Sequence, residues 1–315
     1  MTGTQSHGPN VVVVGSYAVG LVMRTARIPV RGETVLGQDF QAMDGGKGSN
    51  QAIACTRLGA HTTFLAAIGD DSYGHAAVAL FRKEGLDTSF VHRMPDVPTG
   101  TGFILVDPQG DNAIAVDLGA NRLLHPDHID QAEQAIAEAD VVLAQLEIPR
   151  ETALHAMAVA KRHGVRAVLN PAPAQPLPDG ALAVVDILTP NVTEAQVLTG
   201  LTTTDPQALV EALRRAGAGT VILTVGEQGA WIGDDQGLRQ IPAVKVDAVD
   251  STGAGDAFSA ALAVALAQGT ALDDAVRYGC AAGSYSVCSA GTVPSYPTRA
   301  ELAAFLQLHG SMAPA

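Results

Sequence analysis

The 315-residue sequence predicts an α/β fold, with a doubly wound, mostly parallel sheet covered by helices on both faces. Two observations support this prediction. Short apolar runs alternate with segments of helical periodicity, and the runs are continuous in Val, Ile and Leu, as in strands buried on both faces. A third observation adds a small separate β-sheet, because two segments break this rhythm with alternating patterns.

The first elements establish the alternation. Residues 1–9 are polar and predict a disordered tail, and VVVVG at 11–15 predicts the first buried strand. A helix is expected over 50–58, a strand over 62–69 (TTFLAAIG), and a second helix near 74–85. This order is that of βαβ units, in which consecutive strands run parallel.

The same alternation continues through the second half of the chain. Strands are expected in VVLAQLEI (141–148), AVLNP (167–171), DILTPN (186–191) and TVILTVG (220–226), with a helix near 151–163. We therefore expect a single α/β domain over residues 10–309, with ligands bound beyond the carboxyl ends of its strands.

Residues of about 20–44 and 100–118 have no helical periodicity. The second segment, TGFILVDPQGDNAIAVD, predicts a hairpin that turns at 108–112. Both segments are expected to form antiparallel strands outside the main sheet, as a β lid on the α/β domain. A closing lid excludes water from a group-transfer reaction. A dimerisation flap is the alternative, and the two roles can coexist.

The composition narrows the classes of partner. With 32 acidic and 19 basic residues the net charge is −13, which argues against a nucleic-acid-binding surface. Three cysteines are too few for a disulfide framework or a four-ligand zinc site. No stretch approaches the ~20 apolar residues of a membrane helix, and the N-terminus lacks a secretory apolar core. We expect a cytoplasmic protein without a membrane partner.

Two common nucleotide-binding motifs are missing. The sequence contains no GxxxxGK[ST], which excludes an ordinary P-loop enzyme. It also contains no GxGxxG between the first strand and a helix, which disfavours a nicotinamide-dependent dehydrogenase.

The segment DSTGAGDAFSAAL at 250–262 places a carboxylate, Asp256, at the start of an apolar helix. Gly253 and Gly255 free the backbone N–H groups of 253–256 to point at an anion, and the helix dipole adds to their field. Asp256 can then take a proton from an attacking hydroxyl while these groups stabilise a transferring phosphoryl group. A plain helix cap is the alternative interpretation.

Three further segments offer polar groups at expected strand or helix ends. Gly46, Lys47 and Asn50 lie in GGKGSN, where glycines permit close approach to a ligand, although the segment is also compatible with a plain glycine-rich loop. Asn191 and Glu194 share one helix face. They form either a capping box or a site that binds Mg²⁺ and phosphates through water molecules. The loop TVGEQG at 224–229 can approach a nucleotide closely.

Taken together and in order, GGKGxNQA, NxxE and DxxGAGDxF resemble the motifs of the ribokinase-like (PfkB) carbohydrate kinases, over roughly residues 11–308. Within that family the chain is most similar to the ribokinases, on the segments RGETVLG (31–37), LGAN (118–121), QLEIP (145–149), LNPAPA (169–174) and LTPNVTEA (188–195). The resemblance implies the family's ribokinase-like fold, and an ATP- and Mg²⁺-dependent transfer of the γ-phosphoryl group to a hydroxyl of a small sugar.

The resemblance also implies a role for each matching residue. Asp256 is the base, and the anion hole consists of Gly253, Ala254 and Gly255. Asn191 and Glu194 organise Mg²⁺ and phosphates, while the nucleotide site is lined by Thr224, Gly226 and Gly229. The sugar is held by Gly46, Lys47, Asn50 and Glu147.

Many family members bind a monovalent cation, usually K⁺, beside the anion hole. The matching positions, mostly through backbone carbonyls, are Asp250, Thr252, Ser286, Ser289, Gly291 and Ser295. An alternating apolar lid often pairs with a second lid, so a homodimer through the β lid is expected.

One departure concerns the acceptor. In ribokinases the loop after the first strand reads roughly G-S-x-N-x-D, and its Asn and Asp hydrogen-bond the sugar. Here Ala18 and Gly20 occupy those positions, which removes hydrogen bonds worth roughly 1.5–3 kcal/mol each and puts ribose itself in question. Tyr17 is expected to fill the space, or Arg24 or a partner's lid to supply a group. A nucleoside kinase of the same family and a non-catalytic sugar-binding relative are the alternatives.

Overall fold

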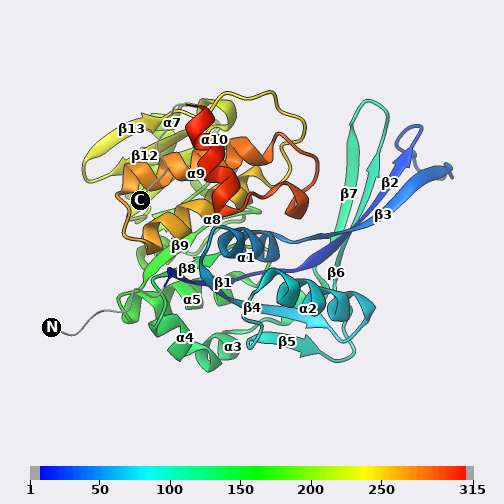
Figure 1. Ribbon diagram of the computed structural model, residues 1–315, viewed down its shortest axis with the longest axis horizontal. Helices are drawn as coiled ribbons and strands as arrows, with labels where there is room; N and C mark the ends of the chain where they lie inside the picture. The colour runs from blue at the N-terminus through cyan, green and yellow to red at the C-terminus, as the bar shows by residue number, and fades with distance from the viewer. Residues whose placement is uncertain (1–7, 310–315) are drawn as a thin grey trace.

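A nine-stranded sheet forms the centre of the computed structural model, which describes residues 8–309 (Figure 1). Its order is β13-β12-β11-β10-β9-β8-β1-β4-β5. The strands are parallel except at the β13 edge, where β12 and β13 run antiparallel to their neighbours. The expected doubly wound, mostly parallel sheet is confirmed. The predicted tail lies largely in residues 1–7, outside the described residues.

The strands of this sheet are β1 (Asn10–Val14), β4 (His61–Gly69), β5 (Val91–Met94), β8 (Val141–Ala144), β9 (Arg166–Leu169), β10 (Ile187–Leu188), β11 (Thr220–Thr224), β12 (Ala230–Asp234) and β13 (Gly237–Ile241). The α-helices are α1 (Lys47–Arg57), α2 (Ser72–Glu84), α3 (Pro126–Gln131), α4 (Glu133–Ala137), α5 (Arg150–Arg162), α6 (Val192–Thr199), α7 (Pro206–Arg215), α8 (Ala254–Ala267), α9 (Leu272–Ser286) and α10 (Arg299–Leu308).

Strand β1 shows why the apolar runs are continuous. Val11 and Val13 pack in one hydrophobic core with α1, α2, α8, α9 and α10, while Val12 and Val14 pack in the other with α3 to α7. All four side chains are fully buried. Because successive side chains of a strand point to opposite faces, a strand covered on both sides needs an apolar residue at every position.

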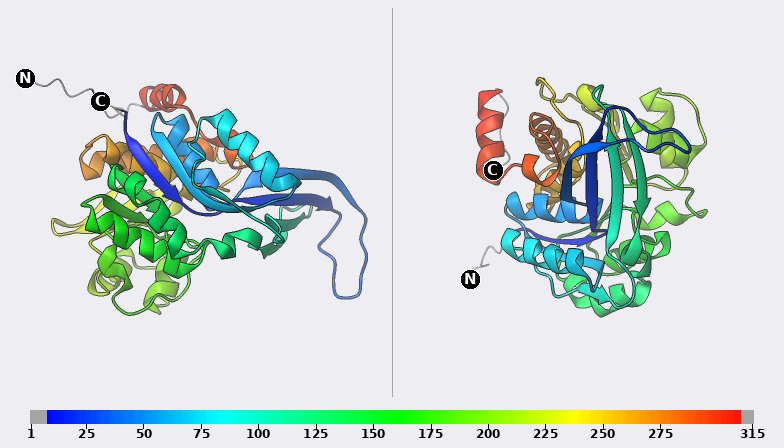
Figure 2. Two further views of the ribbon diagram at one scale, coloured as in Figure 1. Left: turned by 90° about the horizontal axis from the view of Figure 1, so that it is seen from below. Right: turned by 90° about the vertical axis from the view of Figure 1, so that its right-hand side faces the viewer.

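A separate four-stranded sheet projects from one end of the main body (Figure 2). Its order is β3-β2-β6-β7, formed by β2 (Ala18–Thr25), β3 (Gly37–Gly45), β6 (Gly100–Val106) and β7 (Asn112–Asp117). The hairpin β6–β7 turns where the sequence predicts it, but β2 and β6 pair in parallel. The expectation of antiparallel strands throughout is wrong at this pair, because both strands leave the same end of the main sheet, after β1 and after β5.

The four strands predicted over 141–226 are all shorter in the structure, and two of them lose four residues each. Strand β8 stops at Ala144, since the Gln145 side chain turns inward to Gln51 and the Leu146 N–H donates to the carbonyl of Ala172 (2.9 Å). Strand β10 contains only Ile187 and Leu188. In both places the remainder of the apolar segment forms a loop at the carboxyl edge of the sheet, where ligands bind in such folds.

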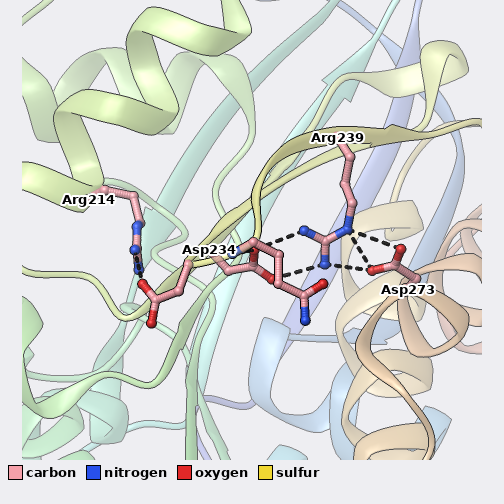
Figure 3. Close-up of polar contacts among 6 residues, drawn as sticks. Arg214, Asp234, Arg239 and Asp273 are labelled. Carbon is pink, nitrogen blue, oxygen red and sulfur yellow. Dashed lines mark hydrogen bonds and ion pairs between the residues drawn. The ribbon is translucent and has the colours of Figure 1, made fainter.

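The β12–β13 hairpin, which the sequence patterns did not predict, is attached to α9 by Arg239 (Figure 3). The Arg239 guanidinium donates two bonds of 2.9 Å to Asp234, and its Nη2 lies 2.6 Å from Asp273 of α9. The hydrogen bonds to Asp234 and Asp273 raise the pKa of Arg239, so this cation stays charged between two carboxylates.

No helix within residues 8–309 combines the length and the hydropathy that crossing a membrane requires.

Candidate active site

The N-terminus of α8 opens into a cavity of about 200 Å³. Gly253 is the N-cap residue and has φ = 79°, a left-handed conformation that favours glycine. The N–H groups of Ala254 and Asp256 already donate to the carbonyls of Ser251 (3.3 Å) and Gly253 (3.0 Å). The prediction that all four N–H groups of 253–256 face an anion is therefore wrong for these two. Gly253 and Gly255 line the cavity.

Asp256 lies in the first turn of α8, with 4 % of its surface exposed. Asn50 Nδ2 donates to its Oδ2 and Gln51 Nε2 donates to its Oδ1, both at 2.9 Å. A buried carboxylate needs such donors, because an unpaired buried charge is costly. These two amides from α1 orient the carboxylate at the wall of the cavity.

The start of α1 brings a cation to the same cavity. Gly46 is the N-cap residue with φ = 91°, and a Cβ at this position would lie 2.8 Å from the backbone N of Ala18. Lys47 lines the cavity, and the Asp256 carboxylate raises the pKa of its ammonium group. Asn50 Oδ1 is buried and has no hydrogen-bond partner within residues 8–309, so it is an unused acceptor.

A chain of buried amides supports Asp256 from behind. Gln51 Nε2 also donates to Asn170 Oδ1 (3.0 Å), and Gln145 Nε2 donates to Gln51 Oε1 (2.5 Å). Asn170 Nδ2 in turn donates to the carbonyl of Thr189 (3.0 Å). Sequence reasoning missed Gln51 and Asn170 as site residues, although both lie in the segments GGKGSNQA and LNPAPA that carry the family resemblance.

Glu147 follows β8 and joins two other segments. Its Oε2 accepts hydrogen bonds from Ser16 Oγ (2.6 Å) and from the backbone N–H of Lys47 (2.8 Å). The carboxylate thus satisfies a free N–H at the start of α1, where negative charge is favourable.

Tyr17 does not lie where the sequence predicts it. Its side chain is fully buried, its ring packs edge-on against Phe81, and its hydroxyl donates to Asp44 Oδ1 (2.6 Å). The expectation that its ring or hydroxyl contacts the acceptor is therefore wrong. The side chain belongs to the hydrophobic core that includes Phe81 of α2.

Ala18 and Gly20 share one face of the small sheet, since side chains alternate along β2. Gly20 is paired with Met43, so their side chains share this face. Met43 reaches the 291–295 loop, where its Cε would lie 3.2 Å from a Cβ on Gly291. A Cβ on Gly20 would lie 3.5 Å from Ile104 Cδ1. The inner face of the sheet is therefore apolar beside the α8 turn.

Asn191 and Glu194 form a reciprocal capping box at the start of α6, with both hydrogen bonds at 2.8 Å. Both side chains also line the cavity, together with Thr224 at the end of β11. Burial raises the pKa of Glu194, while nearby Lys47 opposes this effect. Gly226 begins the adjoining 3₁₀ turn (Gly226–Gln228) and Gly229 follows it; neither residue lines the cavity.

The residues predicted for a monovalent cation come from two loops that the structure brings together. Asp250 Oδ1 accepts the N–H of Thr252 and Oδ2 that of Gly291, both at 2.9 Å. The backbone N–H of Asp250 donates to Val287, between Ser286 and Ser289. Ser295 is buried two residues beyond Val293 at the end of the same loop.

Donors for a divalent metal are sparse in this cavity. Within residues 8–309, no three His, Cys, Asp or Glu side chains are grouped so that they could hold a metal ion. The cavity does contain Glu194 and Asn191, whose oxygens suit Mg²⁺ that keeps several waters and binds mainly through phosphates.

The model of the pfkB family carbohydrate kinases matches residues 9–299, which is almost the whole described chain. The chain belongs to the pfkB carbohydrate kinases. The match spans the α1, α6 and α8 termini that line the cavity. This agrees with the resemblance that the three motifs predict, and the chain is an ATP-dependent sugar kinase of the ribokinase type.

Curated relatives of this pfkB kinase match it over nearly their full length. A ribokinase of Haemophilus influenzae is 40% identical over 300 residues, covering 94% of this chain and 98% of the relative. A deoxyribokinase of Salmonella typhi is 34% identical over 305 residues, covering 95% and 99%. The kinase thus resembles proteins named for two different pentoses.

Among solved structures, ribokinase of Arabidopsis thaliana complexed with ribose and ATP superimposes on the pfkB kinase with a TM-score of 0.89. It is 30% identical and the match covers 96% of this chain and 99% of that one. The ribokinase of Thermotoga maritima gives a TM-score of 0.88 at 33% identity, over 95% and 99% of the two chains.

Proposed function

We propose that this kinase uses Asp256 as the general base that takes the proton from a hydroxyl of a small sugar during attack on the γ-phosphorus of ATP. The observation that carries the proposal is the pair of amide bonds that hold Asp256 at the N-terminus of α8, beside the cavity. A base and an anion-binding helix terminus then lie in one turn.

The surrounding groups have distinct roles in this proposal. The N–H groups of Gly253 and Gly255 stabilise the charge on the transferring phosphoryl group, as does the α8 dipole. Lys47 stays cationic beside Asp256 and neutralises further charge. Asn50 accepts a sugar hydroxyl at its unpartnered Oδ1, and Glu147 keeps one oxygen free for another.

Asn191, Glu194 and Thr224 are proposed to face the nucleotide phosphates and the waters of Mg²⁺, with Gly226 and Gly229 beside the nucleotide. Mg²⁺, when bound, neutralises phosphate charge. The fit is supported by oxygen donors at the cavity wall and by the lack of a closed protein cage for the ion.

A K⁺ site is proposed between the loops joined by Asp250. The hydrogen bonds from Thr252 and Gly291 to Asp250 hold the two loops together, and the carboxylate supplies negative charge. A bound K⁺ adds positive charge behind the turn at Gly253. Backbone carbonyls of both loops and Ser295 are the candidate ligands.

The acceptor is proposed to be a pentose with fewer hydroxyls facing the small sheet than ribose has, and 2-deoxyribose is the probe for this class. Ala18, Gly20, Met43 and Ile104 make the inner face of that sheet apolar. A hydroxyl turned toward this face would lose its hydrogen bonds to water without replacement. The relative named deoxyribokinase makes the same sugar a natural candidate.

The small sheet is proposed to act as a lid and as a homodimer contact, in a cytoplasmic enzyme whose partner is a small sugar. Exposed apolar side chains on this sheet support the contact, with Phe40 and Phe103 both 58 % exposed. The net charge of −13 disfavours a nucleic-acid partner and supports a small-molecule one.

The experiment that tests the catalytic role is a coupled ADP-release assay with ribose, 2-deoxyribose, hexoses, polyols and nucleosides. Asp256→Asn should lower kcat by about 10²- to 10⁴-fold, the usual contribution of a general base, with sugar binding retained. The control is Asp235→Asn, because Asp235 is 96 % exposed and should leave kcat unchanged.

Full activity of Asp256→Asn would show that Asp256 is not the base. Faster turnover of inosine or adenosine than of every free sugar would favour the nucleoside kinase. Sugar binding in calorimetry without any phosphoryl transfer would favour the non-catalytic alternative.

A further inference from the structure

Tyr296 has a buried hydroxyl that the proposed mechanism does not use. The residue is 3 % exposed, and its hydroxyl has no hydrogen-bond partner in the described part of the chain. Buried tyrosine hydroxyls usually find a partner, and an unpaired buried polar group destabilises the folded state. An unpaired Tyr296 hydroxyl therefore indicates a functional role.

The hydroxyl lies against the N-terminal turn of α8, residues 253–256, which is proposed above to bind an anion and is called the anion-binding turn below. A Cβ built on Gly253 would be 2.5 Å from the Tyr296 hydroxyl and 3.0 Å from Thr292 Cγ2. Gly253 is the N-cap of α8 and lines the cavity. A side chain at 253 is thus excluded by Tyr296 as well as by the left-handed backbone.

The backbone of Tyr296 is held firmly in this position. Arg57 Nη1 donates to the carbonyls of Val293 (2.6 Å) and Tyr296 (3.0 Å), and Arg57 pairs with Glu84 through two bonds of 2.8 and 2.9 Å. The same loop is tied to the α8 side by Gly291 N–H and Asp250 Oδ2. The hydroxyl therefore cannot turn away from Gly253 by a simple loop movement.

The phenolic hydroxyl of Tyr296 can donate one hydrogen bond. A protonated hydroxyl aimed at a helix N-terminus suits an anionic oxygen. Because the oxygen is closed off from solvent, that partner reaches it only when the Gly253 turn adjusts.

We propose that Tyr296 is a positioning residue for the anion-binding turn. Its hydroxyl gains a hydrogen-bond partner when the γ-phosphate of the nucleotide binds at this turn. The partner is a phosphate oxygen or a water that the phosphate holds. Binding of the phosphate then moves the Gly253 turn toward the 291–296 loop. This movement couples the anion site to the loop proposed to bind K⁺. This inference rests on the proposed phosphoryl transfer at the same turn.

The test is Tyr296→Phe, with Tyr278→Phe as the matched control, since Tyr278 is also buried (6 % exposed) but lies in α9 and does not line the cavity. In calorimetry with Mg²⁺, Tyr296→Phe should weaken binding of a non-hydrolysable ATP analogue about tenfold and leave ADP binding unchanged. Its kcat should fall by a similar factor, with KM for the sugar within twofold of the wild type.

The melting temperature of the free protein separates this role from a purely structural one. Because the variant removes an unpaired hydroxyl, its melting temperature should be equal to or above that of the wild type. A lower melting temperature with unchanged kcat would overturn the proposal, and so would an equal loss of affinity for ADP and for the ATP analogue. The affinities for ADP and for the ATP analogue can be compared even if no tested sugar is phosphorylated. A failure of the Tyr296 proposal can therefore be distinguished from a failure of the proposed phosphoryl transfer.

Discussion

At the scale of single residues, neutral amides rather than cations hold the carboxylate that we propose as the general base. Asn50 and Gln51 donate to the two oxygens of Asp256, and Gln51 is itself oriented by Gln145 and Asn170. Such donors fix the carboxylate while each oxygen keeps a lone pair. The cation Lys47 is therefore left for the role proposed for it, the neutralisation of phosphate charge.

Two small residues, Ala18 and Gly20, lie on the proposed acceptor side, and Gly20→Asp tests their influence. A Cβ at Gly20 meets only ordinary contacts, 3.5 Å from Ile104 and 3.7 Å from the carbonyl of Met43, so the variant should fold. A carboxylate on the apolar face can accept hydrogen bonds from a sugar hydroxyl. We expect kcat/KM for ribose relative to 2-deoxyribose to rise about ten- to hundredfold, measured with both sugars in the coupled assay.

Gly20→Asn is the control for shape, and its gain for ribose should be smaller because an uncharged amide forms weaker hydrogen bonds. An unchanged ratio in a folded Gly20→Asp enzyme would mean that the acceptor does not lie against this face of the small sheet.

At the scale of elements, an antiparallel hairpin closes one edge of the parallel sheet. The β12–β13 hairpin is joined to α9 by Arg239, which is 25 % exposed between Asp234 and Asp273 (Figure 3). The neighbouring pair of Arg214 and Asp235 has the same chemistry but an Asp235 side chain that is 96 % exposed. Burial distinguishes the two pairs.

Arg239→Met should lower the free energy of unfolding by roughly 2 kcal/mol, because it leaves two partly buried carboxylates without their shared partner. Arg214→Met should change it by less than about 0.5 kcal/mol, since exposed pairs contribute little. Urea unfolding of both variants measures the difference, and equal losses would contradict the assigned importance of burial.

At the scale of the whole molecule, the small sheet projects from the main body (Figure 2). Several of its apolar side chains are exposed. Phe103 of β6 is 58 % exposed on one face of this sheet. Ile114 (57 %) and Val116 (60 %) of β7 are exposed on the opposite face, because Phe103 pairs with Ala115 whereas Ile114 pairs with Ile104. Large exposed apolar patches usually mark a binding surface. A second copy of the same sheet is the proposed partner.

Phe103→Lys should convert a dimer into a monomer, because it places a charge in an apolar contact. Light scattering after size-exclusion chromatography measures the mass. Leu308→Lys is the control, since Leu308 is 84 % exposed at the end of α10, away from the small sheet. A dimer that survives Phe103→Lys, or a wild type that is monomeric throughout, would exclude this contact.

Much of this architecture is predictable from local patterns. The continuous apolar runs predict strands with two buried faces, as Val11 to Val14 show, and the α8 turn is recognisable from its glycines and Asp256. The capping box of Asn191 and Glu194 is also a local motif. These features depend on residues within a few positions of each other, so the sequence alone determines them.

Other features were decided only by the tertiary structure. Gln51 and Asp256 lie 205 positions apart, yet one hydrogen bond joins them. Tyr17 was expected at the acceptor, but packing against Phe81 and a bond to Asp44 turn it into the core. The unpaired hydroxyl of Tyr296 has no sequence signature at all. The physical reason is common to all three: a side chain's partners depend on how distant segments pack, and local periodicity carries no information about them.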